Sequence, residues 1–169
     1  MKLIILDRDG VINQDRDDFV KSADEWIPIE GSMDAIAFLT QAGYTVAVAT
    51  NQSGIGRKYF TVQDLTEMHA KMHRLAVQAG GAIDGIWFCP HTAADNCDCR
   101  KPKPGMICDI LERFKADPAE TWLVGDSLRD LQAVDAAGGK PALVLTGKGK
   151  KTLSEHENEL PENTQIFDN

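Results

Sequence analysis

The sequence lacks any hydrophobic stretch long enough to cross a membrane or to serve as a signal peptide. Its N-terminal apolar run covers only residues 3–6, whereas a membrane-spanning helix needs about 20 apolar residues. We therefore expect a cytoplasmic protein without a membrane partner. In that compartment the four cysteines would be reduced thiols, so metal binding is favoured over disulfide bonds.

The chain also lacks an excess of basic residues. Its 26 acidic residues outnumber its 18 lysines and arginines, which gives a formal net charge of −8 at pH 7. This charge disfavours nucleic acids and anionic membranes as partners. It does not exclude a small anionic substrate, because a local cluster of cations can oppose the global charge.

Internal repeats and linkers rich in Pro, Gly or Ser are absent too, so nothing divides the chain into parts. A length of 169 residues fits one domain, and 43% hydrophobic and 26% charged residues are ordinary for a globular protein. We predict a single domain over residues 1–169 and expect it to be a monomer.

Short apolar runs alternate with segments of helical spacing. Strands are predicted at 3–6, 45–49, 83–88, 121–124 and 142–145, with a further short strand at 165–167. Helices are predicted at 31–42, 61–79, 104–114 and 128–137. This alternation predicts a three-layer α/β fold, in which helices cover both faces of a doubly wound, Rossmann-like parallel sheet.

Polar residues follow four of these strands directly, where ligands bind in parallel sheets. The segments are DRDG at 7–10, TNQSG at 50–54, a loop that ends in RK at 100–101, and GDS at 125–127. Each segment alone could be a turn, a helix cap or a solvated charge. Their joint placement after successive strands makes a coincidence improbable.

Transfer of a phosphoryl group to a carboxylate needs an ionised acid, a second acid for the leaving group, and magnesium to offset the repulsion of two anions. Asp7 and Asp9 provide two acids in one turn, and Asp126 completes a metal site. Thr50 offers a hydroxyl and Lys101 a fixed positive charge for the phosphoryl oxygens.

The motifs DRDG, TNQSG, RKPKPG and GDSLRD together resemble those of the haloacid dehalogenase-like superfamily. The resemblance implies that Asp7 is the nucleophile and that Asp9 is the general acid and base. It also implies that Thr50 and Lys101 stabilise the phosphoryl group during transfer. The expected enzyme is a magnesium-dependent phosphoric monoester hydrolase that works through an aspartyl-phosphate.

The same resemblance implies a magnesium site formed by Asp7, the backbone carbonyl of Asp9, and Asp126. We expect Asp130 to orient Lys101 or a metal-bound water from behind that site. The intervals between the motifs leave no room for the cap domain that this superfamily often carries, so the site should be open.

Cys89, His91, Cys97 and Cys99 form the pattern C-x-H-x5-C-x-C. Four soft ligands within eleven residues suit tetrahedral zinc, although the spacing is tighter than in a common zinc finger. The alternative is a chance cluster of buried thiols. A zinc ion bound here would leave no open position and would be structural. The zinc ion would hold in place the loop that ends at the positively charged residues Arg100 and Lys101.

Within the superfamily, this cluster followed by CRKP resembles the branch of D-glycero-D-manno-heptose 1,7-bisphosphate 7-phosphatases and the related histidinol-phosphate phosphatases. The segments DGVIN and TNQSGIGR favour the heptose enzymes. The expected reaction is hydrolysis of the 7-phosphate, in the supply of nucleotide-sugar heptose for lipopolysaccharide. The alternative within the class is hydrolysis of histidinol phosphate.

Six residues are expected to contact the substrate. Arg100 would bind the second phosphate or sugar hydroxyls, because a guanidinium suits bidentate phosphate contacts. The family position of the acidic loop suggests sugar contacts, and the loop after the second strand should line the site. Besides Arg100, the five residues expected to contact the substrate are Asp15, Asp18, Asn51, Gln52 and Ser53.

Two functions of other classes stay open at this point. A phospho-acceptor signalling domain also combines Asp, Thr, Lys and magnesium, but its acceptor follows a middle strand and no acid lies two residues later. A zinc-dependent interaction module is the third possibility. His69 and His73 have a spacing that could bind metal, but no Glu follows the first His as in H-E-x-x-H and the methionines beside them look like core, so we do not interpret them as a metal site. We interpret Cys108 as a packing residue and residues 147–152 as a mobile loop near the site.

Overall fold

The predicted strands form one parallel sheet of six, which confirms the doubly wound α/β fold. The computed structural model describes all 169 residues. The strands lie in the order β3-β2-β1-β4-β5-β6, and each pairs in parallel with its neighbours. Their bounds are Lys2–Leu6 (β1), Tyr44–Asn51 (β2), Gly85–Cys89 (β3), Trp122–Gly125 (β4), Lys140–Val144 (β5) and Gln165–Phe167 (β6).

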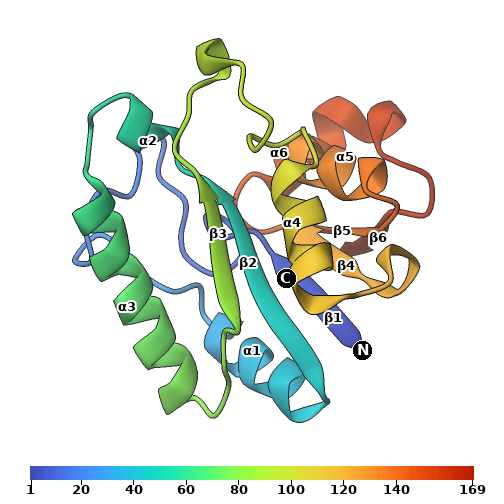
Figure 1. Cartoon of the computed structure of the whole chain (residues 1–169), viewed down its shortest axis with the longest axis horizontal. Helices are drawn as coiled ribbons and strands as arrows, with labels where there is room; N and C mark the ends of the chain where they lie inside the picture. The colour runs from blue at the N-terminus through green and yellow to red at the C-terminus, as the bar shows by residue number, and fades with distance from the viewer.

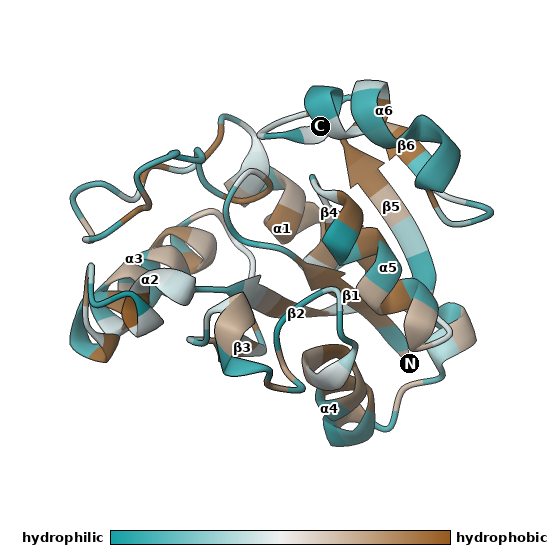
Figure 2. Cartoon of the chain, turned by 90° about the horizontal axis from the view of Figure 1, so that it is seen from above, coloured by the Kyte–Doolittle hydropathy of each residue, from teal (hydrophilic) through white to brown (hydrophobic).

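Helices cover the two faces of this sheet, with α1 and α3 on one side and α4 and α5 on the other (Figures 1 and 2). The helices are Ser32–Gln41 (α1), Ser53–Gly56 (α2), Val62–Gln78 (α3), Gly105–Phe114 (α4), Leu128–Ala136 (α5) and Gly149–His156 (α6). Three short 3-10 turns are Ala93–Asp95 (η1), Pro118–Glu120 (η2) and Glu157–Glu159 (η3). No helix is both long and apolar enough to cross a membrane.

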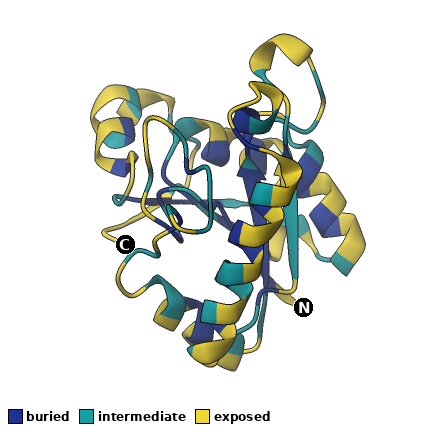
Figure 3. Ribbon diagram, turned by 90° about the vertical axis from the view of Figure 1, so that its left-hand side faces the viewer, coloured by how far each residue is buried: buried dark blue, intermediate teal, exposed yellow.

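The central strand β1 is buried on both faces because successive side chains of a strand point in opposite directions. Ile4 and Leu6 pack with α1 and α3 in one apolar cluster. Leu3 and Ile5 pack with α4 and α5 in the other. Figure 3 shows the result, with buried strands between helices whose outer surfaces are exposed. This packing fixes the position of whatever follows β1.

Local sequence signals explain where the longest helix begins and ends. The Thr61 side chain accepts a hydrogen bond from the amide of Asp64, and the Asp64 carboxylate accepts one from the amide of Thr61, which forms a reciprocal N-terminal cap. After the helix ends, Gly80 has a φ of +95°, a conformation that glycine adopts without strain. The prediction of a helix over 61–79 is therefore confirmed within one residue at each end.

The carboxyl edge of the sheet has no cap domain inserted over it. The chain from β1 to β2 forms a loop and α1, and the chain from β2 to β3 forms α2 and α3. The loop that follows β3 rises beyond this edge in Figure 1 and contains η1. Cys108 is exposed on α4, so the prediction that it packs in the core is wrong.

Candidate active site

Three neighbouring strands bring predicted site residues to one edge of the sheet. β1, between β2 and β4, ends immediately before Asp7, while Thr50 lies near the end of β2 and Asp126 directly follows β4. Parallel strands end at a common edge, so these side chains meet there. They line a cavity of about 230 Å³ whose wall contains five aspartates, four arginines, one lysine and a single hydrophobic residue, Phe19.

Lys101 lies beneath this cavity and is only 1% exposed. Its Nζ lies 3.0 Å from Asp7 Oδ1 and 2.7 Å from Asp130 Oδ1, and it donates to the carbonyl oxygen of Ala49 at 2.8 Å. These partners match the three hydrogens of an ammonium group. Burial lowers the pKa of Lys101, but Asp130 and Asp7 raise it further, so its pKa lies above the ordinary value. The side chain is a fixed positive charge.

Asp7, Asp126 and Asp130 form a buried acidic cluster in which one oxygen of each lies within 4.8 Å of the others. Burial and the charge of Asp130 raise the pKa of Asp7 well above its usual range, in spite of Lys101. Burial and Asp130 also raise the pKa of Asp126 to about 6. Three carboxylates against one ammonium leave an excess of negative charge among hard oxygen donors. This donor set fits magnesium.

Oxygen atoms remain available for such a cation. Lys101 occupies Oδ1 of Asp7, and the amide of Lys148 donates to Oδ2 of Asp126 at 2.8 Å, which leaves the second oxygen of each carboxylate. The backbone carbonyl of Asp9 accepts none of the hydrogen bonds outside the helices and strands. Asp7, Asp126 and the Asp9 carbonyl could therefore hold the cation together.

Asp130 serves the site and a helix at the same time. Its Oδ2 accepts hydrogen bonds from the hydroxyl of Ser127 at 2.8 Å and from the Ser127 amide at 3.2 Å, which caps α5. Its Oδ1 faces Lys101, and the side chain is fully buried. The helix cap therefore fixes the carboxylate that lies against the lysine.

The start of α6 and the residue that precedes it pack against the acidic cluster. Thr152 donates its hydroxyl to the carbonyl of Asp126 at 2.8 Å, beside the amide contact of Lys148. On the other side, Gly10 has a φ of +87°, and a Cβ there would collide with the Asp126 carboxylate. The prediction of a loop at 147–152 is wrong, because α6 begins within it and is tied to the site.

Asp9 is held by four side-chain hydrogen bonds. Arg8 donates to Oδ1 through Nε at 3.0 Å and Nη2 at 2.8 Å, and Asn13 donates to the same oxygen at 2.9 Å. Gln52 donates to Oδ2 at 3.2 Å and to the hydroxyl oxygen of Thr50 at 2.8 Å. Burial raises the pKa of Asp9, but Arg8 and these hydrogen bonds lower it more, so the pKa lies below its usual value.

The other polar residues of the TNQSG segment lie in the cavity wall. The side chain of Asn51 is bound to the main chain of Lys101, accepting from its amide at 3.0 Å and donating to its carbonyl at 3.1 Å. It thereby fixes the backbone that carries the buried lysine. Ser53 is 8% exposed at the start of α2.

Three arginines at this cavity come from different elements. Arg57 follows α2, Arg100 precedes Lys101, and Arg129 lies on α5. None of them has a carboxylate partner within 4.0 Å among the ion pairs of the protein. Burial lowers the pKa of Arg100, and the positive charges of Arg129 and Arg57 nearby lower it further.

Of these three arginines, only Arg100 was predicted from the sequence as a substrate contact, and Arg57 and Arg129 were missed. The signal was present, because Arg57 ends the segment TNQSGIGR and Arg129 lies inside GDSLRD. Only the folded chain shows that these residues share one cavity with Arg100.

The two acids of the loop after β1 have different surroundings. Asp15 lines the cavity, and its carboxylate lies 3.6 Å from Nζ of Lys148. Asp18 is outside the cavity wall, is 65% exposed, and pairs with Arg16 at 3.0 Å and Lys21 at 3.4 Å. The structure therefore places Asp15, and not Asp18, where a substrate could reach it.

The three cysteines of the predicted zinc site come together at the base of the loop after β3. The Sγ of Cys97 lies 3.6 Å from that of Cys89 and 3.7 Å from that of Cys99. Zinc–sulfur bonds of about 2.3 Å in a tetrahedron separate the sulfurs by roughly 3.8 Å, so these two spacings fit. The Cys89 and Cys99 sulfurs are closer, at 2.7 Å.

His91 does not join this cluster. Its side chain is 48% exposed, and Nδ1 lies 3.9 Å from the carboxylate of Asp95. Asp95 is held in place by Thr92 at the start of η1. The structure thus gathers three of the four predicted ligands.

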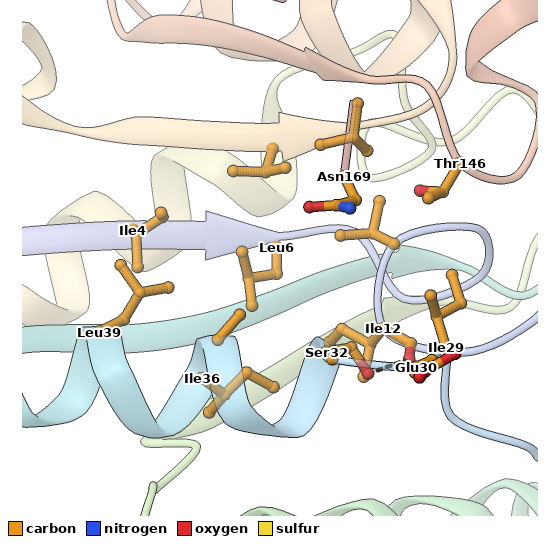
Figure 4. A pocket seen from close by; sticks show the side chains of 15 residues that line it. Ile4, Leu6, Ile12, Ile29, Glu30, Ser32, Ile36, Leu39, Thr146 and Asn169 are labelled. Atoms are coloured by element: carbon orange, nitrogen blue, oxygen red, sulfur yellow. Dashed lines mark hydrogen bonds between the residues drawn. The ribbon is translucent and has the colours of Figure 1, made fainter. Parts of the chain in front are cut away.

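A second cavity of about 260 Å³ lies between the sheet and α1, and its lining is mostly apolar (Figure 4). Ile4, Leu6, Ile36 and Leu39 line it, with Asn169 at one side. It contains none of the aspartates of the first cavity. Without a cluster of groups that could perform chemistry, it is not the candidate active site.

Comparison with known families agrees with this geometry. Residues 5–138 match the model of the haloacid dehalogenase-like hydrolases. The D-glycero-beta-D-manno-heptose-1,7-bisphosphate 7-phosphatase of Neisseria meningitidis serogroup A is 86% identical over 168 residues, which cover 99% of this chain and 90% of the relative. The enzyme of the same name from Pseudomonas putida is 54% identical, with 99% of this chain and 94% of the relative covered.

A solved structure extends the comparison to three dimensions. The D,D-heptose 1,7-bisphosphate phosphatase of B. bronchiseptica, complexed with magnesium and phosphate, is 56% identical and superposes with a TM-score of 0.97. The match covers 100% of this chain and 93% of that protein. Magnesium is thus present in a relative with the same fold.

Proposed function

The chain belongs to the haloacid dehalogenase-like hydrolases, and from this premise we propose that it removes the 7-phosphate of D-glycero-D-manno-heptose 1,7-bisphosphate. The 7-phosphatase names of relatives at 86% and 54% identity support this substrate. The observation that carries the proposal is a single cavity whose wall contains the acidic residues Asp7, Asp9 and Asp126 together with three arginines that pair with no carboxylate. Such a cavity fits a substrate with two phosphates.

Asp7 is the proposed nucleophile. Its carboxylate is fixed by Lys101 and lies at the cavity floor. An oxygen of Asp7 attacks the phosphorus of the 7-phosphate, and the bond between phosphorus and the sugar oxygen breaks. The electron pair of that bond leaves with the sugar oxygen, and the phosphoryl group stays on Asp7 as an aspartyl-phosphate.

Asp9 is the proposed acid and base. The negative charge of a bound phosphate would favour the protonated form of Asp9 over the ionised form that Arg8 favours without substrate. Asp9 then gives its proton to the departing sugar oxygen and later accepts one from the water that attacks the aspartyl-phosphate. That attack breaks the bond between phosphorus and the Asp7 oxygen, so inorganic phosphate is released and Asp7 is restored. Thr50 and Lys101 are proposed to contact the phosphoryl oxygens while their charge is redistributed.

Asp7, Asp126 and the carbonyl of Asp9 are the proposed magnesium ligands. The bound cation would offset the repulsion between the Asp7 carboxylate and the phosphate. Asp130 acts behind them by holding Lys101, which it contacts at 2.7 Å. Because burial and repulsion from Asp130 raise the pKa of both Asp7 and Asp126, their ionised forms are more stable with a cation beside them.

The second phosphate is proposed to lie against Arg57, Arg100 and Arg129. These guanidinium groups have no carboxylate partner, and each can donate two parallel hydrogen bonds to phosphate oxygens. Histidinol phosphate would place an ammonium group near the same three positive charges. Higher initial rates of the purified enzyme with histidinol phosphate than with the heptose bisphosphate would contradict the proposal.

Replacing Arg100 by Gln should raise the KM for the heptose 1,7-bisphosphate by roughly tenfold, because a charge-assisted hydrogen bond contributes about 1.5–3 kcal/mol. The KM for heptose 7-phosphate, which has no second phosphate, should change little. Steady-state rates on the two substrates provide the measurement.

Arg113→Gln is the matched control, because Arg113 is exposed on α4 and lies outside the cavity. Its KM for both substrates should stay at the wild-type value. Equal increases in KM for bisphosphate and monophosphate in Arg100→Gln would exclude a contact between Arg100 and the second phosphate.

Zinc is the proposed occupant of the cysteine cluster, with a structural role. Cys99 directly precedes Arg100 and Lys101, so a metal bound to Cys89, Cys97 and Cys99 would fix the loop that carries both cations. His91 could complete the tetrahedron only after its imidazole turns from Asp95 toward the sulfurs.

Replacing Cys99 by Ser should remove bound zinc and weaken substrate binding, because the loop that holds Arg100 would no longer be fixed. We expect about one zinc per wild-type chain and much less in the variant, together with a KM raised severalfold. Metal content can be measured by elemental analysis of the purified proteins.

Cys108→Ser serves as the comparison, since Cys108 is exposed on α4 and is not one of the three thiols of the cluster. It should retain zinc and an unchanged KM. Unchanged metal content and kinetics in Cys99→Ser would show that the cluster has no such role.

A further inference from the structure

Arg8 lies between the two aspartates of the first motif, yet its side chain does not line the active-site cavity. It is 0% exposed and extends toward α3. Nε and Nη2 donate to Asp9 Oδ1, while Nη1 lies 3.2 Å from Nε2 of His69. A single buried guanidinium therefore connects the proposed acid and base with a residue of α3.

His69 is suited to accept a hydrogen bond from this arginine. It is 9% exposed on α3, between the buried Met68 and Met72. Burial and the positive charge of Arg8 lower the pKa of His69 to about 3, so the imidazole is neutral at physiological pH. A neutral ring has one nitrogen with a free lone pair, and Nε2 is the nitrogen that faces Nη1.

The hydrogen bonds of Asp9 show what this contact could control. Three donors converge on Oδ1, two of them from Arg8 and one from Asn13, whereas Oδ2 receives only Gln52. Oδ1 is thereby anchored, and Oδ2 is the oxygen left to exchange a proton in the cavity. The direction of Oδ2 depends on the position of Arg8, whose planar group is fixed at its other end by His69.

We infer that His69 is a positioning residue for phosphoryl transfer: through Arg8 it orients Asp9, so that Oδ2 faces the leaving oxygen. The inference rests on the proposed role of Asp9 as acid and base. Without the acceptor on His69, Nη1 of a fully buried arginine loses its closest polar partner. The guanidinium would then move toward other acceptors and take the Asp9 carboxylate with it.

The test uses two leaving groups that differ in their need for a proton. A sugar alkoxide must be protonated as it leaves, whereas p-nitrophenolate is a stable anion. Single-turnover release of each leaving group reports the first half-reaction alone, before water attacks. His69→Leu should slow release of the sugar roughly tenfold, because a misplaced acid loses part of its effect, and should slow release of p-nitrophenolate less than threefold.

Two amide variants separate hydrogen bonding from packing. The side chain of Gln can place an acceptor near the position of Nε2, whereas the side chain of Asn is one methylene shorter. His69→Gln should therefore recover most of the sugar release rate, and His69→Asn should resemble His69→Leu. If His69→Leu does not fold, the difference in sugar release rate between His69→Gln and His69→Asn tests the inference by itself.

His73→Gln is the matched control, because His73 lies one turn further along α3 and makes no side-chain hydrogen bond to Arg8 or Asp9. It should leave both release rates unchanged. In an Asp9→Asn background, His69→Leu should cause no further selective loss, because the group that it positions is absent.

Equal losses for the two leaving groups in a folded His69→Leu variant would overturn the inference, as would a Gln variant no better than Asn. These outcomes differ from the result expected if the proposed substrate is wrong, which is low wild-type activity on the heptose bisphosphate. Any alkyl phosphate that the wild type hydrolyses can then replace the heptose in the leaving-group comparison.

Discussion

Asp7→Asn should lower phosphate release from the heptose bisphosphate by at least about a thousandfold, because a neutral amide cannot attack phosphorus. The side chain keeps nearly the same shape. Burial and nearby carboxylates disfavour the ionised form of Asp7, so removal of its charge should not weaken the fold. Lys101 retains Asp130 and the Ala49 carbonyl as partners. Thermal unfolding and initial rates measure the two effects separately.

A chemical signature should accompany this loss. Wild-type enzyme quenched during turnover of labelled substrate should retain protein-bound phosphate that hydroxylamine releases, as an acyl phosphate does, and Asp7→Asn should retain none. Asp18→Asn is the control, since Asp18 is exposed and outside the cavity. If Asp7→Asn turned over at a rate near that of the wild type, phosphate could not pass through this carboxylate.

Lys101→Met should reduce both activity and stability strongly. The lysine is 1% exposed, and its loss leaves Asp7 and Asp130 buried without a cation. Removing one partner of a buried ion pair costs about 3–5 kcal/mol of unfolding free energy. Turnover should fall at least about a hundredfold, because the phosphoryl oxygens lose a fixed positive charge. Denaturant unfolding and steady-state rates provide the measurements.

A double variant separates these two consequences. In Lys101→Met combined with Asp130→Asn, one uncompensated buried charge is removed, so part of the stability should return while activity stays low. Lys150→Met is the control, because Lys150 is exposed on α6 and has no ion-pair partner within 4.0 Å. Wild-type activity in folded Lys101→Met would contradict the role proposed for this residue.

Most of the fold could be predicted from the sequence because its signals are local. Each strand is a short apolar run, and its polar continuation marks the carboxyl end. The long helix α3 has a Thr61–Asp64 cap at one end and glycines at the other. By contrast, α6 was missed, because it buries only Gly149 and Thr152 and shows no apolar stripe.

The acids of the site could be predicted for a related reason. Asp7, Thr50 and Asp126 each lie at the carboxyl end of a strand, and strands of a parallel sheet end at one edge. The motif resemblance and this rule agree on the same positions. No such rule relates the side chains of loops and helices, so the motifs that contain Arg57 and Arg129 did not show that these residues share a cavity.

Some predicted contacts changed once the loops were folded. Asp18 pairs with Arg16 and Lys21 and lies outside the cavity wall, whereas Asn51 lines the cavity while its side chain is bound to the backbone of Lys101. A motif specifies which residue types are near a site. Hydrogen-bond partners from distant segments decide which of those side chains remain available.

The sequence by itself determined the parallel sheet, the family and the edge at which the acids gather, because these depend on short apolar runs and on motifs contiguous in the chain. Only the tertiary structure decided which charges face each other. The contact between Arg8 and His69 and the three arginines at one cavity join segments distant along the chain. Contacts of this kind depend on how helices pack on the sheet, and no local pattern encodes them.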